Sequence, residues 1–213
     1  IDDPKVNLDF GNQNRAKKNY RAAIYYYNNA IESQRILPLG LAFGYLYRGL
    51  AYRMLKPDSY AYAKKSLLDF IEAANIRELG PENTIYANFL AGEMYYLIGE
   101  NFAVSTYEKD RSYENALQRF EISLNLPGYD QQVDIKKQIF LIRCAIAKRL
   151  MGLVKVQKSK NRKNYPIKLT EKLTAVVAKI EADFKVFSQD KSIAEEIGAD
   201  YIKFALEYEE LKK

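Results

Sequence analysis

The chain has 213 residues, of which 48% are hydrophobic and 28% are charged, and its formal net charge is +6. Such a composition is typical of a folded globular chain and excludes an intrinsically disordered one. Histidine is absent and cysteine occurs once, at Cys144, which excludes a Ser-His-Asp triad, a Cys-His pair and an internal disulfide framework.

Helical periodicity dominates the chain, and no stretch shows the alternation of a half-buried strand. Pairs that contain proline separate the helical segments: Leu37-Pro38, Lys56-Pro57, Gly80-Pro81, Pro127-Gly128 and Tyr165-Pro166. We predict helices at residues 5–18, 20–34, 40–55, 59–77, 82–99, 111–126, 131–157, 168–188 and 192–211. Residues 101–112 form an expected insertion and residues 158–166 an expected basic loop. The longest uncharged run, residues 36–47, is too short to span a bilayer, so no membrane span is expected.

A pattern recurs three times within residues 5–130. The first helix of each expected pair carries a glycine: Gly11, Gly49 and Gly92. The second helix opens with a tyrosine: Tyr20, Tyr60 and Tyr113. An alanine follows one turn later, and then a large residue: Ala23 and Tyr27, Ala63 and Leu67, Ala116 and Phe120. This recurrence indicates a repeat protein, in which each unit buries its apolar face against the next.

The pattern resembles the tetratricopeptide repeat (TPR) superfamily, although the first repeat has Asn14 where an aromatic residue is usual and the second has Phe70 at the second alanine. The resemblance implies an all-α fold, a right-handed superhelical stack of TPR-like helical hairpins. Residues 1–130 would form three helix pairs, with the insertion at 101–112. Residues 131–213 would form a degenerate fourth pair, with the basic loop at 158–166, and a C-terminal capping helix. Within the run of tyrosines, Tyr25 and Tyr26 are expected to pack between repeats or to lie on the convex surface.

The resemblance also implies a binding surface, because the first helices of such pairs line a concave face. That face would take a peptide, helix or domain of another protein. The positions expected there, beside Leu8, are Asn12, Arg15, Phe43, Leu46, Leu50, Arg53, Tyr86, Phe89, Glu93 and Tyr96. The alternative for each of them is packing against the neighbouring hairpin. No phosphate-binding glycine motif is present, so we predict a scaffold or adaptor that is not an enzyme and needs no cofactor and no metal.

Positive charge is concentrated in residues 136–172, which hold twelve Lys or Arg and a single acid, Glu171. Its basic candidates are Lys155, Lys158, Lys160, Arg162, Lys163 and Lys168. The alternative function is therefore an electrostatic adaptor that contacts an acidic partner, an anionic membrane or nucleic acid. No nucleic-acid-binding motif accompanies these residues, which disfavours nucleic acid. Because the chain begins with Ile1 and not with Met, we expect a periplasmic or envelope-associated protein that lacks its signal or anchor, with the cytoplasm as the alternative.

Overall fold

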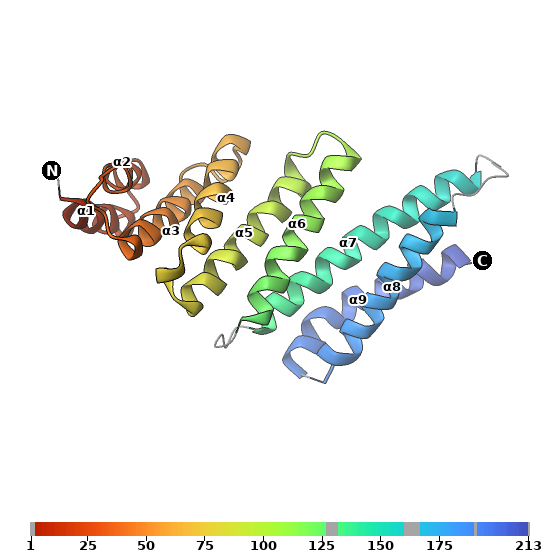
Figure 1. The fold of residues 1–213 in the computed structure, drawn as a ribbon. Coiled ribbons are helices and arrows are strands. Elements are labelled where there is room, and N and C mark those ends of the chain that lie inside the picture. Colours follow the sequence, from red (N-terminus) through yellow and green to blue (C-terminus); the bar gives the residue numbers. More distant parts are fainter. Residues whose placement is uncertain (1–2, 127–131, 160–166, 190, 213) are drawn as a thin grey trace. The chain divides into compact units, whose positions relative to one another are not determined.

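The computed structural model describes residues 3–126, 132–159, 167–189 and 191–212 (Figure 1). Over these ranges the chain forms nine α-helices and one short 3-10 helix, with no strand, which confirms the all-α prediction. The chain divides into two compact units, Ile1–Asp130 and Gln131–Lys213.

The first unit is built from α1 (Pro4–Ala16), α2 (Tyr20–Ile31), α3 (Pro38–Leu55), α4 (Tyr60–Asn75), η1 (Arg77–Leu79), α5 (Pro81–Asn101) and α6 (Thr106–Asn125). Each α-helix packs against the one that follows it, and α1 also contacts α3. The result is a row of three helical hairpins, α1–α2, α3–α4 and α5–α6 (Figure 1).

Local sequence signals explain where these helices begin. Prolines stand in the first turn of α1, α3 and α5, where the missing N–H is not needed. Asp3 caps α1 by accepting from the backbone N–H groups of Lys5 and Val6, and Ser105 caps α6 by accepting from the Glu108 N–H. The helices of the third hairpin are longer than predicted, because α5 continues to Asn101 and α6 already begins at Thr106. The expected insertion at 101–112 is therefore mostly helical.

A glycine in the first helix of each hairpin lies against an aromatic ring in the second. A Cβ atom built on Gly11 would be 2.4 Å from the Tyr27 ring, and one on Gly92 would be 2.8 Å from the Phe120 ring. In the second hairpin the ring partner of Gly49 is Phe70, at 2.7 Å. Only a residue without a side chain lets the two helix backbones approach this closely. The glycines therefore set the spacing of all three hairpins.

In the second hairpin, the predicted alignment of α4 with the recurring sequence pattern is wrong. The large residue that faces the glycine is Phe70 and not Leu67, and the small residue one turn before it is Ser66 and not Ala63. The Ser66 hydroxyl is buried and donates to the backbone carbonyl of Gly49 at 2.8 Å. A helix can carry serine at such a tight position because the hydroxyl finds an acceptor on the neighbouring helix.

A buried polar network joins the first two hairpins. Arg48 of α3 donates to both carboxylate oxygens of Asp69 on α4, at 2.7 and 2.8 Å, and to the side-chain oxygen of Asn28 on α2, at 2.8 Å. One guanidinium thus fixes three helices by charge-assisted hydrogen bonds. Within the first hairpin, the ring of Tyr26 packs on Phe10 at 5.3 Å between centroids, whereas Tyr25 is exposed.

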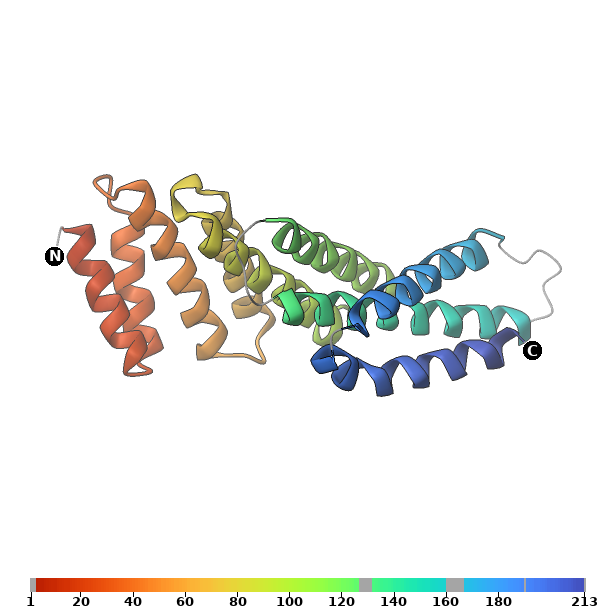
Figure 2. The same ribbon diagram turned by 90° about the horizontal axis from the view of Figure 1, so that it is seen from below.

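The second unit contains α7 (Gln132–Ser159), α8 (Ile167–Phe187) and α9 (Lys191–Lys212). In Figure 2, α8 and α9 lie along two sides of α7, and both contact it. Apolar residues at helical spacing along α7 are buried from Ile135 to Leu150, but Leu153, which continues this spacing, is exposed. The rings of Phe184 and Tyr201 stack at 3.8 Å between α8 and α9. Cys144 is buried, as a structural thiol in the core of this unit.

Candidate partner-binding surface

Side chains from successive first helices contact one another. Arg53 of α3 and Glu93 of α5 form an ion pair at 2.8 Å, and the Arg15 guanidinium of α1 lies 4.7 Å from the centre of the Tyr47 ring of α3. Asn12 accepts a hydrogen bond from the Tyr27 hydroxyl at 2.8 Å. These four predicted partner-binding residues therefore contact side chains of their own chain. Each contact restrains the conformations of the two side chains that form it.

Three of the predicted positions point toward the core or toward the second helix of a hairpin. Leu46 is only 2% exposed in the core between α3, α4 and α5, so its prediction as a partner-binding residue is wrong. Phe89 packs on Phe120 at 5.5 Å, and Tyr96 stacks on Tyr113 at 5.7 Å. The rings of Phe89 and Tyr96 therefore have a structural role within the third hairpin. Leu50 and Tyr86 are half-buried against the same core.

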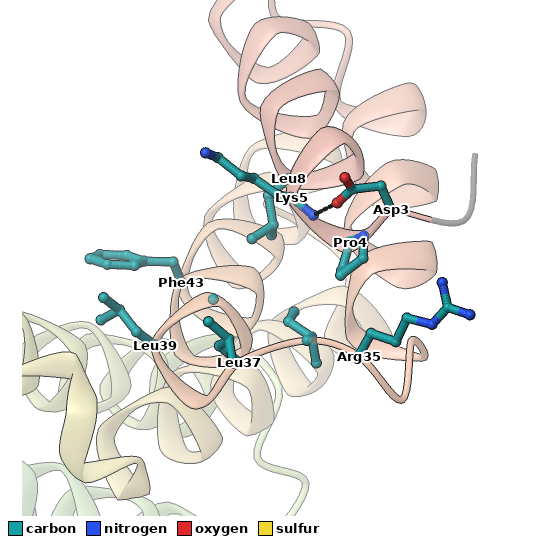
Figure 3. Close-up of a pocket in the computed structure, with 10 residues that line it drawn as sticks. Asp3, Pro4, Lys5, Leu8, Arg35, Leu37, Leu39 and Phe43 are labelled. Carbon is teal, nitrogen blue, oxygen red and sulfur yellow. Dashed lines mark hydrogen bonds between the residues drawn. The ribbon is translucent and has the colours of Figure 1, made fainter.

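A pocket of about 770 Å³ lies between the start of α1, the α2–α3 connection and the start of α3 (Figure 3). It is lined by Asp3, Pro4, Lys5, Leu8, Arg35, Ile36, Leu37, Leu39, Gly40 and Phe43. We call it the N-terminal pocket. Of the ten residues predicted to bind a partner, the pocket contains Phe43, and it also contains Leu8.

The local sequence explains why this pocket is apolar and open. Leu37 is 75% exposed and Leu39 is 46% exposed, because Pro38 starts α3 and leaves the two leucines at the helix tip. A Cβ atom on Gly40 would touch Leu8 at 3.4 Å and Ile36 at 3.3 Å, so the glycine keeps space between α1 and α3 free. Phe43 is held in place by stacking on Tyr47 at 5.5 Å.

Charged residues stand at the edges of the N-terminal pocket. Lys5 and Arg35 lie on opposite sides of it, and their charged ends extend away from the apolar lining (Figure 3). The single acid of the lining, Asp3, already accepts hydrogen bonds from the backbone at the start of α1, at 2.8 and 3.4 Å. The lining therefore carries two exposed cations and one exposed carboxylate, a small net positive charge.

The sequence carries a signal for this pocket, because residues 36–47 form the longest run without charge. Two residues of this run, Leu37 and Leu39, are exposed where α3 begins.

A second pocket, of about 510 Å³, lies at the tip of the third hairpin. It is lined by Tyr60, Ile98, Phe102, Ala103, Val104, Glu108, Arg111, Ser112 and Asn115. The rings of Tyr60 and Phe102 meet across it at 5.7 Å. Its lining is more mixed than that of the N-terminal pocket, with Glu108 and Arg111 of opposite charge beside each other.

Most of the predicted basic candidates fall outside the part of the chain that is described. The structure does not describe Lys160, Arg162 and Lys163, and it does not describe the side chains of Lys158 and Lys168. Lys155 is exposed near the end of α7. The charge itself is divided unequally: residues 131–213 hold 18 Lys or Arg and 11 acids, whereas residues 1–130 hold 15 and 16.

No described helix is long and apolar enough to cross a membrane. Among the described residues there is also no group of three or more Cys, Asp or Glu side chains that could hold a metal ion. The fold and the N-terminal pocket define a protein of stacked helical hairpins with an exposed apolar pocket. No protein-family model, curated protein or solved structure matches the chain.

Proposed function

We propose that the chain is a non-catalytic scaffold that binds another protein through the side of its hairpins formed by α1, α3 and α5. The observation that carries this proposal is the N-terminal pocket, where Leu37 and Leu39 expose apolar surface beside the ordered walls of Leu8 and Phe43. Exposed, contiguous apolar surface on a folded domain is typical of a site that another molecule covers.

We further propose that the three hairpins form a TPR-like stack. Supporting this, the glycine-to-ring contact recurs in each hairpin, at Gly11, Gly49 and Gly92. The pair of Arg53 and Glu93 also puts the first helices of the second and third hairpins on the same side. Stacks of this kind offer extended binding surfaces made from successive repeats.

Site-specific photo-crosslinking tests the scaffold proposal. A photoreactive amino acid replaces Leu39 in the pocket or, as the matched control, the exposed Tyr25 on α2. In an extract of the source organism, we expect a discrete crosslinked protein from position 39, and we expect an excess of unmodified chain to suppress it. Equal crosslinking from both positions, or no crosslinking from position 39, would contradict the proposal.

A second candidate function is supported by the surplus of basic residues in 131–213, which favours an acidic partner or an anionic surface there. Co-sedimentation with vesicles of anionic lipid, and binding to heparin, test it over a range of salt concentrations. A functional electrostatic surface would lose affinity steeply as salt increases. Binding to neither material at low salt would remove this candidate.

A further inference from the structure

We propose that the N-terminal pocket binds a large apolar side chain from an acidic segment of a partner protein, with Lys5 and Arg35 pairing with carboxylates on either side of that side chain. The inference rests on the proposed scaffold function and narrows its partner to one chemical class. The partner would therefore contact the starts of α1 and α3 and the connection before α3. It would not contact the middle of α1, α3 or α5.

The lining of the pocket determines the apolar part of the ligand. Pro4, Leu8, Leu37, Leu39 and Phe43 surround one space (Figure 3). Its volume of about 770 Å³ lies within the range of specific ligand pockets, roughly 300 to 1,000 Å³. Such a space takes a bulky side chain together with the neighbouring backbone of its segment.

The walls of the pocket exist before any ligand arrives. Phe43 stacks on Tyr47, which itself lies 6.4 Å from Tyr27 between ring centres. Leu8 packs against the buried cluster of the first hairpin. Binding therefore does not have to order these side chains, and a preformed pocket loses less conformational entropy on binding.

The charges at the rim select the sign of the ligand. Lys5 and Arg35 are exposed cations on opposite sides, while Asp3 already accepts from two backbone N–H groups at the start of α1. A segment that carries acids on both sides of its apolar residue would place a carboxylate near each cation. A segment with basic flanks would be repelled, so the rim adds specificity to the apolar contact.

The test begins with a selection that does not presuppose a ligand sequence. Random peptides of about 12 residues, the length of a typical docked segment, are displayed on phage and selected on the full chain. We expect enriched peptides to share one large apolar residue with Asp or Glu on both sides. Enrichment of neutral or basic sequences, or no enrichment, would overturn the proposal.

The best peptide is then synthesised with a fluorophore, and its affinity is measured by fluorescence anisotropy against variants of exposed residues. Replacing Leu37 and Leu39 together by Ser should weaken binding about 10-fold or more, as expected for anchor contacts. Replacing Lys5 and Arg35 together by Glu should weaken it by a similar factor and reverse its salt dependence. The matched controls, Leu68→Ser and Lys64→Glu on the exposed face of α4, should change the affinity less than about twofold.

Two further outcomes separate this proposal from its alternatives. If a selected peptide binds but none of the pocket variants affects it, the pocket assignment is wrong while the scaffold function stands. If the fatty acid oleate binds the pocket and no peptide is enriched, the site is a lipid site and the proposal fails. A discrete protein crosslinked at Leu39, together with selected peptides that lack acidic flanks, would leave the scaffold function standing and overturn only the proposed ligand class.

Discussion

Gly49 of α3 and Phe70 of α4 lie so close that a Cβ atom on the glycine would stand 2.7 Å from the ring carbon Cε1 and 2.9 Å from Cδ1. The Phe70 ring is fully buried, and Asp69 beside it would be 3.2 Å from the same Cβ atom. The contact therefore sets the distance between α3 and α4.

Gly49→Ala is expected to lower the free energy of unfolding by about 1 to 3 kcal/mol, because the added methyl group forces Phe70 or the α3 backbone to shift. Urea denaturation followed by circular dichroism measures the change. Gly198→Ala on α9 is the control, since a Cβ atom there meets nothing within 4 Å. That variant should be neutral or more stable by up to about 1 kcal/mol, from helix propensity. Equal changes in the free energy of unfolding from the two substitutions would contradict the destabilising effect expected from the close contact of Gly49 with Phe70.

Arg48→Met should be much more destabilising than Arg53→Met. The first leaves the Asp69 carboxylate buried without its cation, and side-chain exposure in that pair is only 17% and 6%. Breaking such a pair typically costs about 3 to 5 kcal/mol. The pair of Arg53 with Glu93 is more exposed, at 35% and 25%, and is worth about 1 kcal/mol or less. Chemical denaturation of both variants tests the order.

Replacing Asp69 by Leu together with Arg48→Met should recover most of the loss, because no unpaired charge then remains in the core. If the single and double variants are equally unstable, then the cost arises from packing and not from the uncompensated carboxylate. Arg53→Met serves as the control for removing a guanidinium from α3.

The hydroxyl group of Tyr27 makes the free energy of unfolding depend on pH in the alkaline range. Burial raises the pKa of its hydroxyl from 10.0 to about 12. The unfolded chain therefore releases this proton first, and the contribution of Tyr27 to stability, complete below pH 10, is lost as the pH rises toward 12. The loss amounts to about 2 kcal/mol by the upper end of that window.

Tyr27→Phe removes both the titration and the hydrogen bond to Asn12. The variant should be less stable than the wild type by about 1 kcal/mol near neutral pH, and the difference should shrink and then reverse in alkali. Urea titrations at a series of pH values measure it. Tyr25→Phe, at an exposed position on the same helix, should follow the wild-type curve. If the difference in the free energy of unfolding between wild type and Tyr27→Phe stays constant over the alkaline range, then titration of the Tyr27 hydroxyl does not affect stability.

Cys144 should resist alkylation as long as the second unit is folded. Burial raises the pKa of its thiol to about 12, so almost no thiolate is present near neutral pH. Labelling with iodoacetamide near pH 8 is expected to be roughly 1,000-fold slower for the native chain than for the chain unfolded in urea. Rapid native labelling, followed by mass spectrometry, would show that this part of α7 opens readily.

The helices could be predicted from the sequence because their apolar spacing and their prolines are local signals. Every predicted helix has its counterpart, and the largest difference is the start of α6, which lies within the predicted insertion at 101–112. The three glycines of the recurring pattern are the points where the helices approach closely. The partner of Gly49 could not be predicted from the sequence, because Leu67 and Phe70 are both buried and only the distance between helices distinguishes them.

The surface was harder to predict than the fold. Phe89 and Tyr96 follow helical spacing on α5, but whether a ring on such a stripe faces a partner or the adjacent helix depends on the rotation of α5 against α6. That rotation is set by the Gly92 contact with Phe120, which is a tertiary relationship. The N-terminal pocket depends in the same way on three segments that come together only in the folded chain.

The lengthened third hairpin has a practical consequence. Its tip, residues 102–105, joins two helices of 21 and 20 residues, and Val104 there is 91% exposed. Exposed tips with few contacts tolerate inserted sequence better than other positions. A short affinity tag or fluorescent reporter placed beside Val104 would lie outside the N-terminal pocket, since the tip and that pocket share no lining residue. The molecule thus offers its own attachment point for the binding measurements.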